Sequence, residues 1–317
     1  MKRKLADYLW DAWCIGSVVG IWPRFIEPKL LKTSNLHLKL DSRFPRLTGL
    51  KIAHFSDLHW SDDFPSLLGE QLIHKIKKAQ PDLILFTGDM LSRSVLHSPA
   101  RLEELLSNLH ASLGSFAVLG NHDYQEFISI SQEGNYDIKS PSPHPNIVQG
   151  FKRLFQPVDL TRKVTERASK TPPHPDLLSL LEKTPFELLD NRTAYIPYKN
   201  SGVNLTGLGD YTAGRCFPQL AFKNYRKDFP GIVLAHNPDS VPLLHNFPGD
   251  IILAGHTHGG QVNLPLIWKR FTQIENLRYK GGLHCLGSKR LYVNRGIGSV
   301  MKFRWFSPPE LTFITIE

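Results

Sequence analysis

Five short blocks of histidine, aspartate, asparagine and glycine contain the residues of this chain that could do chemistry. Each block follows an apolar segment of the kind that forms a buried strand. The blocks are Asp57-Leu58-His59, Gly88-Asp89, Gly120-Asn121-His122-Asp123, His236-Asn237-Pro238 and Gly255-His256-Thr257-His258-Gly259-Gly260-Gln261. Carboxylate and amide oxygens, together with imidazole nitrogens, suit divalent ions such as manganese, iron or zinc. The pattern predicts a metal site without thiolates.

The number of candidate ligands predicts two ions. The set comprises Asp57, His59, Asp89, Asn121, His236, His256 and His258. These seven ligands are too many for one ion, whereas a shared carboxylate can bridge two ions roughly 3.5–4 Å apart. Asp89 is central in the order and is the best candidate for the bridge.

The spacing of the blocks predicts that they converge. Asp89 follows Asp57 by 32 residues, and Asn121 follows Asp89 by 32 again. A βαβ unit takes roughly 30 or more residues, so each block lies one crossover after the last. In open α/β sheets, ligands bind outside the carboxyl ends of the strands. The blocks therefore stand where a shared site would form.

Each block alone also has an ordinary structural explanation. An aspartate at a strand end commonly caps a helix, and the Gly and Asn of the third block suit a tight turn. A single histidine is more often structural than a ligand. Asp123 could orient the neighbouring backbone or ligands, and a plain turn is an equal alternative. All five blocks in this order, each after an apolar strand, favour the metal site.

The chain around the blocks predicts an α/β fold. Strands are predicted at Lys51–Ser56, Asp82–Thr87, Phe116–Leu119, Phe186–Leu189, Ala194–Pro197, Val203–Gly207, Ile232–Ala235, Ile251–Ala254 and Leu311–Ile316. Helices are predicted at Pro65–Ala79, Pro99–Ser112 and Pro218–Tyr225. Continuous apolar strands of this kind are buried on both faces. Residues 124–175, after the third core strand, are proline-rich and basic and predict a long insertion. We expect a mobile cap there, with a disordered surface loop as the alternative.

The N-terminus predicts a membrane-associating segment over residues 1–30, followed by a catalytic domain over 45–317. Lys2, Arg3 and Lys4 precede an apolar stretch from Tyr8 to Trp22, which Pro23 is expected to end. The stretch is shorter than the roughly 20 residues that span a bilayer. Its tryptophans favour the membrane–water interface, which fits a helix lying in the headgroup region. A terminal helix docked on the protein's own core is the alternative.

Composition and charge narrow the class of protein. The chain of 317 residues is long enough for one large domain, and its three cysteines show no CxxC pairing, which argues against a disulfide framework. The 38 basic residues exceed the 29 acidic ones, for a net charge of +9. A basic surface attracts nucleic acid, phospholipid headgroups or phosphorylated substrates, so charge alone does not choose among them.

The five blocks in this order resemble the calcineurin-like metallophosphoesterase superfamily over residues 50 to about 300. The resemblance implies two packed mixed sheets flanked by helices, and hydrolysis of a phosphorus–oxygen bond by metal-activated water. It also implies two ion sites, for which we expect Mn²⁺. One would comprise Asp57, His59, Asp89 and His258, and the other Asp89, Asn121, His236 and His256. His122, beside a ligand but not assigned to an ion, would stabilise developing charge or protonate the leaving oxygen.

Two further features resemble the membrane-associated, lipid-directed branch of this superfamily. The apolar N-terminus leads into IEPKLL, and VNRGIGS surrounds Arg295. The nearest resemblance is to UDP-2,3-diacylglucosamine pyrophosphatases of the lipid A pathway, which implies attack at the α phosphorus to give UMP and 2,3-diacylglucosamine 1-phosphate. We expect Arg93 and Arg295 to contact such a substrate. A better-known enzyme of that reaction carries arginine where this chain has His122, which argues against close kinship with it.

Three alternatives stay open at this point. They are another phosphoesterase of proteins, nucleotides or nucleic acid, a peripheral membrane scaffold, and a phospholipid or sphingolipid phosphodiesterase. The complete ligand set argues against a scaffold, and a nuclease does not need the apolar N-terminus. As partners we expect a UDP-linked acylated sugar or another phospholipid substrate and a membrane surface, but no nucleic acid; no protein partner is inferred. The expected location is the cytoplasmic side of the cell's inner membrane, as a peripheral protein.

Overall fold

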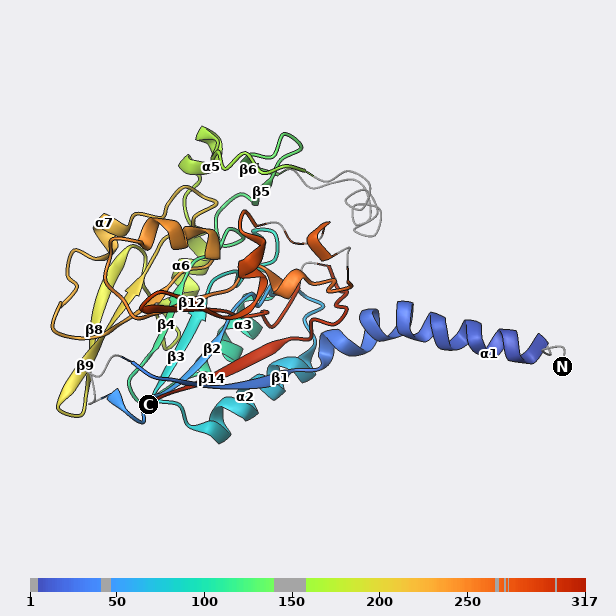
Figure 1. Ribbon diagram of the computed structural model, residues 1–317, viewed down its shortest axis with the longest axis horizontal. Helices are drawn as coiled ribbons and strands as arrows, with labels where there is room; N and C mark the ends of the chain where they lie inside the picture. Colours follow the sequence, from blue (N-terminus) through green and yellow to red (C-terminus); the bar gives the residue numbers. More distant parts are fainter. Residues whose placement is uncertain are drawn as a thin grey trace.

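Two stacked sheets form the body of the protein, and a helix at the N-terminus projects from one side (Figure 1). The computed structural model describes residues 5–40, 47–139, 158–265, 268–270, 272, 274–299 and 301–317. The basic cluster at residues 2–4 and the central part of the predicted insertion, residues 140–157, lie outside the described residues.

The first sheet is mixed and has the strand order β1-β14-β2-β3-β4-β7. Its strands are β1 (Lys32–Leu38), β2 (Lys51–Phe55), β3 (Leu83–Thr87), β4 (Ser115–Val118), β7 (Phe186–Leu188) and β14 (Glu310–Ile316). The four strands from β2 to β7 are parallel, and β14 pairs antiparallel with β2. The crossovers contain α2 (Ser66–Ala79) and α3 (Pro99–Ser107). Parallel pairing brings the carboxyl ends of β2, β3 and β4 to one edge.

The second sheet has the order β12-β13-β11-β10-β9-β8. Its strands are β8 (Arg192–Tyr198), β9 (Ser201–Gly207), β10 (Gly231–Leu234), β11 (Ile251–Ala254), β12 (Gly282–Leu286) and β13 (Lys289–Val293). The inner four strands are parallel, and β8 and β12 pair antiparallel at the two edges. The short helices α7 (Pro218–Ala221) and η4 (Pro238–Leu244) lie on the outer face of this sheet.

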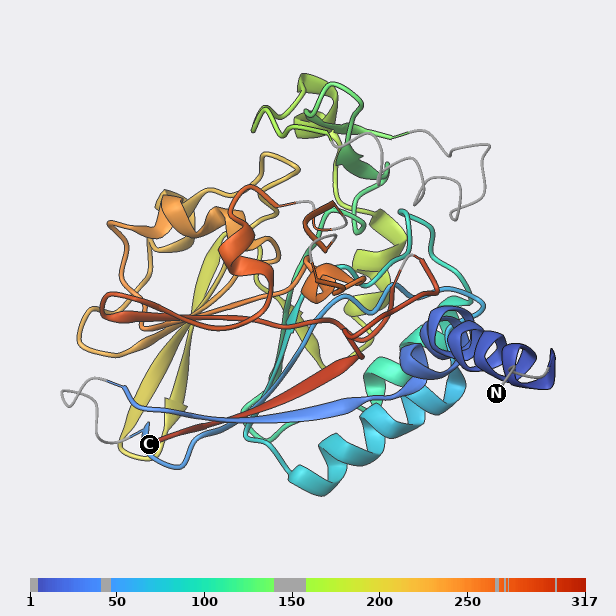
Figure 2. The same ribbon diagram turned by 45° about the vertical axis from the view of Figure 1, so that its right-hand side comes forward.

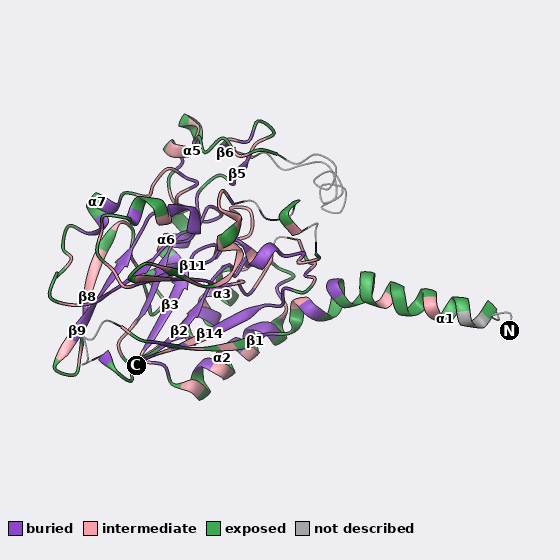
Figure 3. Cartoon of the chain, in the orientation of Figure 1, coloured by how far each residue is buried: buried purple, intermediate pink, exposed green. Residues whose placement is uncertain are grey.

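Alternation along the strands explains how the layers pack. In β3, Leu83 and Leu85 belong to the cluster between the sheets, together with Leu205 of β9. Ile84 and Phe86 point the other way and pack in the cluster that includes α2 and α3. Burying each such side chain contributes roughly 1.5–3 kcal/mol. Central strands such as β3 and β11 are buried along their whole length, whereas the edge strands β1 and β8 are largely exposed or half-buried (Figure 3). The helix–sheet–sheet–helix layers confirm the predicted fold class.

The ends of the predicted insertion pack on the body. They contain β5 (Ile128–Ile130), β6 (Tyr136–Ile138) and α5 (Glu166–Lys170), and α6 (Pro175–Leu181) follows. Tyr124 pairs with Pro173 and Tyr136 with Val164, so the outgoing and returning chains run side by side. Tyr124 and Tyr136 are also buried. The described parts therefore form a compact structure at the top of Figure 2, on the side where β2, β3 and β4 end.

The N-terminal helix consists of α1 (Leu5–Gly16), the π-helix η1 (Ser17–Ile26) and the turn η2 (Glu27–Lys29). Many of its exposed side chains are apolar; Leu9 and Trp10, for example, are 63% and 67% exposed, so α1 is not packed on the body. In the described part of the chain, no helix combines the length and apolar character that crossing a membrane requires.

Three predicted helix ends are wrong. Pro23 does not end the helix, because proline removes only one N–H donor and the wider π-helical turn continues to Ile26. The helix predicted to reach Ser112 ends at Ser107, where the amide of Asn108 binds the Glu104 carbonyl. The helix predicted from Pro218 to Tyr225 ends at Ala221.

The first sheet begins earlier than the predicted domain start at residue 45. Strand β1 pairs in parallel with β14 at the sheet edge, and its side chains are mostly polar. A polar edge strand has no apolar run that could reveal it in the sequence.

Candidate metal centre

The candidate ligands come from five strand ends of both sheets. Asp57 and His59 follow β2, Asp89 follows β3, Asn121 follows β4, His236 follows β10, and His256 and His258 follow β11. All of these strands are parallel within their sheets, so their carboxyl ends meet where the two sheets adjoin. The fold thus brings together residues separated by about 200 positions, as the spacing predicted.

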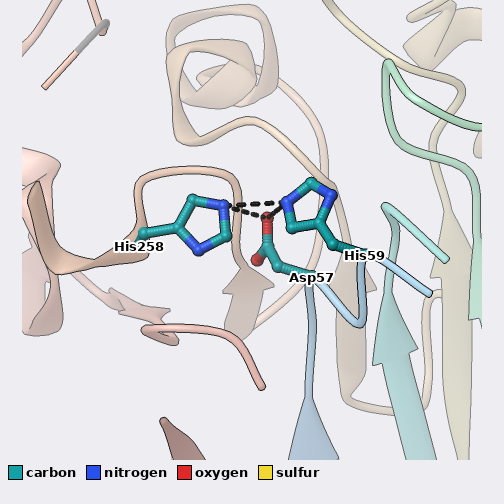
Figure 4. Close-up of side chains that lie close together, drawn as sticks. All are labelled: Asp57, His59 and His258. Carbon is teal, nitrogen blue, oxygen red and sulfur yellow. Dashed lines mark hydrogen bonds and ion pairs between the residues drawn. The ribbon is translucent and has the colours of Figure 1, made fainter. Parts of the chain in front are cut away.

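The first group of ligands consists of Asp57, His59 and His258, whose ligand atoms lie within 4.8 Å of one another. The Nε2 atoms of the two imidazoles are 2.9 Å apart, and Oδ1 of Asp57 lies 3.5 Å from Nε2 of His258. Figure 4 shows the two rings and the carboxylate pointing to one place. This convergence of lone-pair atoms suits one divalent ion.

The second group consists of Asp89, His236 and His256, again with ligand atoms within 4.8 Å. Nε2 of His236 lies 3.2 Å from Oδ2 of Asp89 and 3.1 Å from Nδ1 of His256. Asn121 donates its amide N–H to the Ile128 carbonyl, which leaves Oδ1 buried without a hydrogen-bond partner among the described residues. A buried oxygen of this kind, beside carboxylate and imidazole donors, fits a metal ligand.

One oxygen connects the two groups. Oδ2 of Asp89 lies 3.2 Å from Nε2 of His236 in the second group and 3.7 Å from Nε2 of His59 in the first. The other oxygen, Oδ1, accepts the backbone N–H of His122. The carboxylate is therefore held between the groups, which is the position of a bridging ligand.

Backbone carbonyls select the tautomer of two histidines. Nδ1 of His236 is 2.7 Å from the Thr87 carbonyl oxygen, and Nδ1 of His59 is 3.3 Å from that of Leu91. A carbonyl can only accept, so Nδ1 carries the proton and Nε2 presents its lone pair to the site. Such outer contacts are usual for metal-binding histidines.

Burial and mutual charge set the ionisation of these groups. Burial raises the pKa of Asp89 to about 7 and also raises the pKa of Asp57, whereas it lowers the pKa of His59 to about 3. Burial alone would lower the pKa of His236, but the Asp89 and Asp57 carboxylates raise it well above its usual value. A divalent cation binds ionised carboxylates and neutral imidazoles. The carboxylates and imidazoles of this site are therefore suitable ligands for such a cation.

The backbone of the site is strained. Asp57, His59, Asp89, His256 and His258 all have φ between 44° and 70°, the left-handed region that residues other than glycine rarely adopt. Strained backbone of this kind is typical of functional sites, where the surrounding structure holds it in place.

Glycines bring the backbone close to the ligands. A Cβ atom on Gly120 would overlap the Asp89 carboxylate, and one on Gly255 would overlap Ser56 and the Asp57 carboxylate. These close approaches explain the glycines that begin the third and fifth blocks.

Asp123 organises the backbone around Asp89. Its Oδ2 accepts the N–H groups of Asp89 and Gly120, each at 2.9 Å, and its Oδ1 accepts that of Leu91. The side chain is buried, so these bonds are shielded from water. Of the two roles open from the sequence, the geometry shows the orienting one.

His122 borders both groups and lies beside the insertion. Its Nε2 is 3.8 Å from Oδ2 of Asp89, and its ring packs 4.5 Å from that of Phe127. Together with His59 and Asp89 it forms a third set of atoms close enough to hold an ion. However, Nδ1 of His122 lies 2.8 Å from the backbone nitrogen of Arg93, which can only donate. The neutral ring therefore carries its proton on Nε2, which suits a hydrogen-bond donor better than a ligand.

The two arginines expected to contact substrate differ in their surroundings. Arg93 is half-buried and follows Asp89 on the loop that binds His122. Arg295 forms a two-pronged ion pair with Glu310, with N–O distances of 3.0 and 3.2 Å. Sequence reasoning missed Arg304, which is fully buried with Nη2 3.2 Å from Nδ1 of His258. Arg304 lies outside the five blocks and in no recognisable motif, so only the folded structure shows that it is close to His258.

Comparison with known proteins agrees with this geometry. Residues 50–260 match the sequence profile of the calcineurin-like phosphoesterases. The UDP-2,3-diacylglucosamine pyrophosphatases LpxG of Chlamydia trachomatis and Chlamydia muridarum are 36% and 37% identical to this chain; each alignment covers 92% of this chain and 91% of the relative. The phosphodiesterase YaeI of Escherichia coli is 30% identical over 84% of this chain and 82% of its own length. The chain therefore belongs to the calcineurin-like phosphoesterase family and is a metal-dependent hydrolase.

Proposed function

We propose that this protein hydrolyses the pyrophosphate bond of UDP-2,3-diacylglucosamine, yielding UMP and 2,3-diacylglucosamine 1-phosphate in lipid A biosynthesis. The observation that carries the proposal is the identity of 36–37% with two enzymes named for this substrate, extended over more than nine-tenths of both lengths. An alignment of that extent covers much more of the chain than the five blocks of the metal centre. The alternative of another phosphodiesterase has support from the more distant YaeI relative.

The ligand set of the proposed enzyme comprises the seven residues of the two groups. Two divalent ions, which we expect to be Mn²⁺, would neutralise the phosphate oxygens and supply an activated water as nucleophile. Asp57, His59 and His258 would hold one ion and Asn121, His236 and His256 the other, with Asp89 shared. With their protons on Nδ1, His59 and His236 would present the Nε2 lone pairs as ligands to the ions.

The reaction adds water across the pyrophosphate bond. The new bond forms between the water oxygen and the α phosphorus, and the bond from the α phosphorus to the bridging oxygen breaks. The bridging oxygen leaves with the sugar 1-phosphate, and UMP keeps the oxygen that came from water. His122 presents its Nε2–H to the site and donates a hydrogen bond to the departing oxygen, whose developing charge it stabilises. Arg93 adds positive charge on the adjoining loop; Arg295, held by Glu310, remains a candidate for substrate contact.

A membrane location follows from the exposed N-terminal helix and the acylated substrate. We expect the helix to lie on the cytoplasmic face of the inner membrane, with Trp10, Trp13 and Phe25 in the headgroup region. In this proposal residues 1–30 form the membrane-associating segment and the catalytic domain follows them. The insertion, residues 124–175, starts beside His122 and would cover the lipid portion of the substrate.

A substrate panel tests the proposed function. Purified protein with Mn²⁺ would receive UDP-2,3-diacylglucosamine, non-acylated UDP-glucosamine, a phosphatidylglycerol dispersion and a small chromogenic phosphodiester. Mass spectrometry should find UMP and the lipid monophosphate from the first, at a rate far above the others. When the reaction runs in ¹⁸O-water, the label should appear in UMP. Faster cleavage of phosphatidylglycerol, or label in the lipid monophosphate, would contradict the proposal.

A further inference from the structure

The N-terminal helix is fastened to a loop behind the metal centre by one buried carboxylate. Glu27 is only 3% exposed, and its Oε1 accepts the backbone N–H of Ser307 at 2.6 Å. Its Oε2 accepts the N–H of Phe306 at 3.1 Å and the indole N–H of Trp22 at 2.8 Å. Ser307 is 280 positions from Glu27. The two backbone donors fix this carboxylate on the segment 303–307, which we name the support loop, and the Trp22 indole orients it from the helix side.

Two further bonds join the helix to the support loop and to Lys302 just before it. The backbone N–H of Arg304 donates to the carbonyl of Pro23 at 2.8 Å, and the guanidinium of Arg24 donates to the carbonyl of Lys302 at 2.9 Å. Arg24 is exposed, so its bond contributes little, whereas the Glu27 and Pro23 contacts are buried. The attachment is thus concentrated at the C-terminal end of the helix, and it does not involve the exposed α1.

The support loop in turn holds a metal-ligand candidate. The hydroxyl of Ser307 donates to the backbone carbonyl of His258 at 2.6 Å. His258 has a left-handed backbone with φ 51°, and the following Gly259 has φ 61°, so this stretch needs outside contacts to keep its shape. A Cβ atom on Gly259 would overlap the Ser307 hydroxyl, which shows how closely the two backbones approach.

Arg304 of the support loop reaches the other side of the first group. Its guanidinium is fully buried and donates to the carbonyls of Arg295 at 3.0 Å, Gly296 at 3.2 Å and also Gly298. Gly298 donates its own N–H to the carbonyl of Asp57 at 2.7 Å. The support loop therefore braces both Asp57 and His258, which belong to the first group.

We propose that Glu27 is a positioning residue for the metal centre: through the support loop it holds Asp57 and His258 in the geometry that binds the first ion. The inference rests on the proposed ligand set. It divides the N-terminal segment into two parts with separate functions. Helix α1 presents apolar side chains to the membrane, and Glu27 supports the metal site whether or not a membrane is present. Loss of such outer contacts typically lowers metal affinity 10–100-fold.

Metal affinity, measured by equilibrium dialysis against Mn²⁺ in detergent solution, tests the inference. Glu27→Ala should weaken one of the two ions by roughly 10–100-fold and leave the other unchanged. Ser307→Ala removes only the hydroxyl bond to His258 and should weaken the same ion by a smaller factor. Glu70→Ala, on the exposed face of α2, is the matched control and should match the wild type. Deletion of residues 2–16, which spares Pro23 and Glu27, should also leave both affinities unchanged.

Double variants identify the ion concerned. In a His258→Ala background, which removes a ligand of the first group, Glu27→Ala should have no further effect on the remaining ion. In a His236→Ala background, Glu27→Ala should still weaken the remaining ion 10–100-fold. This non-additivity is the signature of two residues that act on one site, and a general loss of stability would not produce it.

The possible results distinguish a wrong ligand set from a wrong role for Glu27. If His258→Ala protein still binds two ions with wild-type affinity, the proposed ligand set is wrong and the inference fails with it. If His258→Ala loses one ion while folded Glu27→Ala keeps both at wild-type affinity, only the positioning role is wrong. Circular dichroism would show whether Glu27→Ala folds. If it does not fold, Ser307→Ala decides, and wild-type affinity in that variant would overturn the positioning role.

Discussion

The Nδ1 atom of His122 accepts a hydrogen bond from the backbone N–H of Arg93 over 2.8 Å. This bond fixes the tautomer of a histidine whose Nε2 faces the shared carboxylate of Asp89 at 3.8 Å. Because the donor is a backbone group on a neighbouring loop, His122 stays in this orientation whatever the side chain of residue 93. The proton on Nε2 is therefore available to a substrate oxygen.

Replacing His122 by alanine should lower kcat by roughly 10²–10³, the range for loss of one hydrogen-bond donor to developing charge. The metal content should stay at two ions, because Nε2 carries a proton and is not a ligand. Steady-state kinetics and elemental analysis of the same preparation provide the two readouts. His74→Ala, an exposed histidine of α2, is the control and should retain wild-type kcat. Loss of an ion from the His122 variant would show that this residue is a ligand instead.

Among the ligand variants, Asp89→Ala should have the largest effect. Its Oδ2 is shared by both groups, so its removal weakens both ions, whereas Asn121→Ala removes a ligand from one group only. We expect chelator treatment to abolish wild-type activity and Mn²⁺ to restore it. Under the same conditions, Asp89→Ala should remain inactive and Asn121→Ala should recover in part at high Mn²⁺. Full activity of metal-free Asp89→Ala protein would exclude the two-ion mechanism.

Deletion of residues 1–16 should release the protein from membranes without inactivating it. The deletion removes Leu9, Trp10 and Trp13, which are all exposed, and keeps the attachment at Pro23 and Glu27. It also removes the basic residues at positions 2–4, each worth about 1 kcal/mol at an anionic surface.

Cosedimentation with phosphatidylglycerol vesicles gives the measurement for this deletion. Binding should fall at least tenfold, while hydrolysis of a small chromogenic phosphodiester should stay within twofold of the wild type. Unchanged binding to the vesicles would mean that the membrane surface lies elsewhere on the protein.

Replacing residues 130–171 with a short Gly/Ser linker should reduce hydrolysis of the acylated nucleotide far more than that of the chromogenic diester. The linker spares the pairing of Tyr124 with Pro173, so the two chain ends remain together. It also spares Ile128, whose carbonyl orients Asn121. Each acyl methylene that is no longer buried costs about 0.8 kcal/mol of binding free energy. A small diester has no acyl chain, so its binding does not weaken in this way.

A point variant provides the matched test of the insertion. Glu275 accepts hydrogen bonds from the hydroxyl groups of Tyr136, in β6, and Tyr211, each at 3.1 Å. It also forms an ion pair with Arg162 at 3.2 Å. Glu275→Ala should therefore loosen the insertion and reproduce part of the selective loss. Limited proteolysis should cut the variant faster than the wild type. Equal loss on both substrates in the linker variant would mean that residues 124–175 do not select the lipid.

The amino-acid sequence by itself predicted where the candidate metal centre lies and which side chains meet there. Apolar strands are local patterns, and a ligand that follows each one must lie at the carboxyl edge of a parallel sheet. The spacing of 32 residues between Asp57, Asp89 and Asn121 matches one crossover each, so the order of the strands followed from the chain alone. The α2 helix and the buried strands followed from the same periodicities.

Only the tertiary structure decided how the atoms face one another. That Oδ2 of Asp89 lies close to both groups, and that the carbonyl of Thr87 sets the tautomer of His236, depends on the stacking of two sheets. The pairing of polar β1 with β14 and the bond from Glu27 to Ser307 join residues more than 270 positions apart. Such contacts have no periodicity in the sequence, because they arise only when the folded layers bring distant backbone groups together.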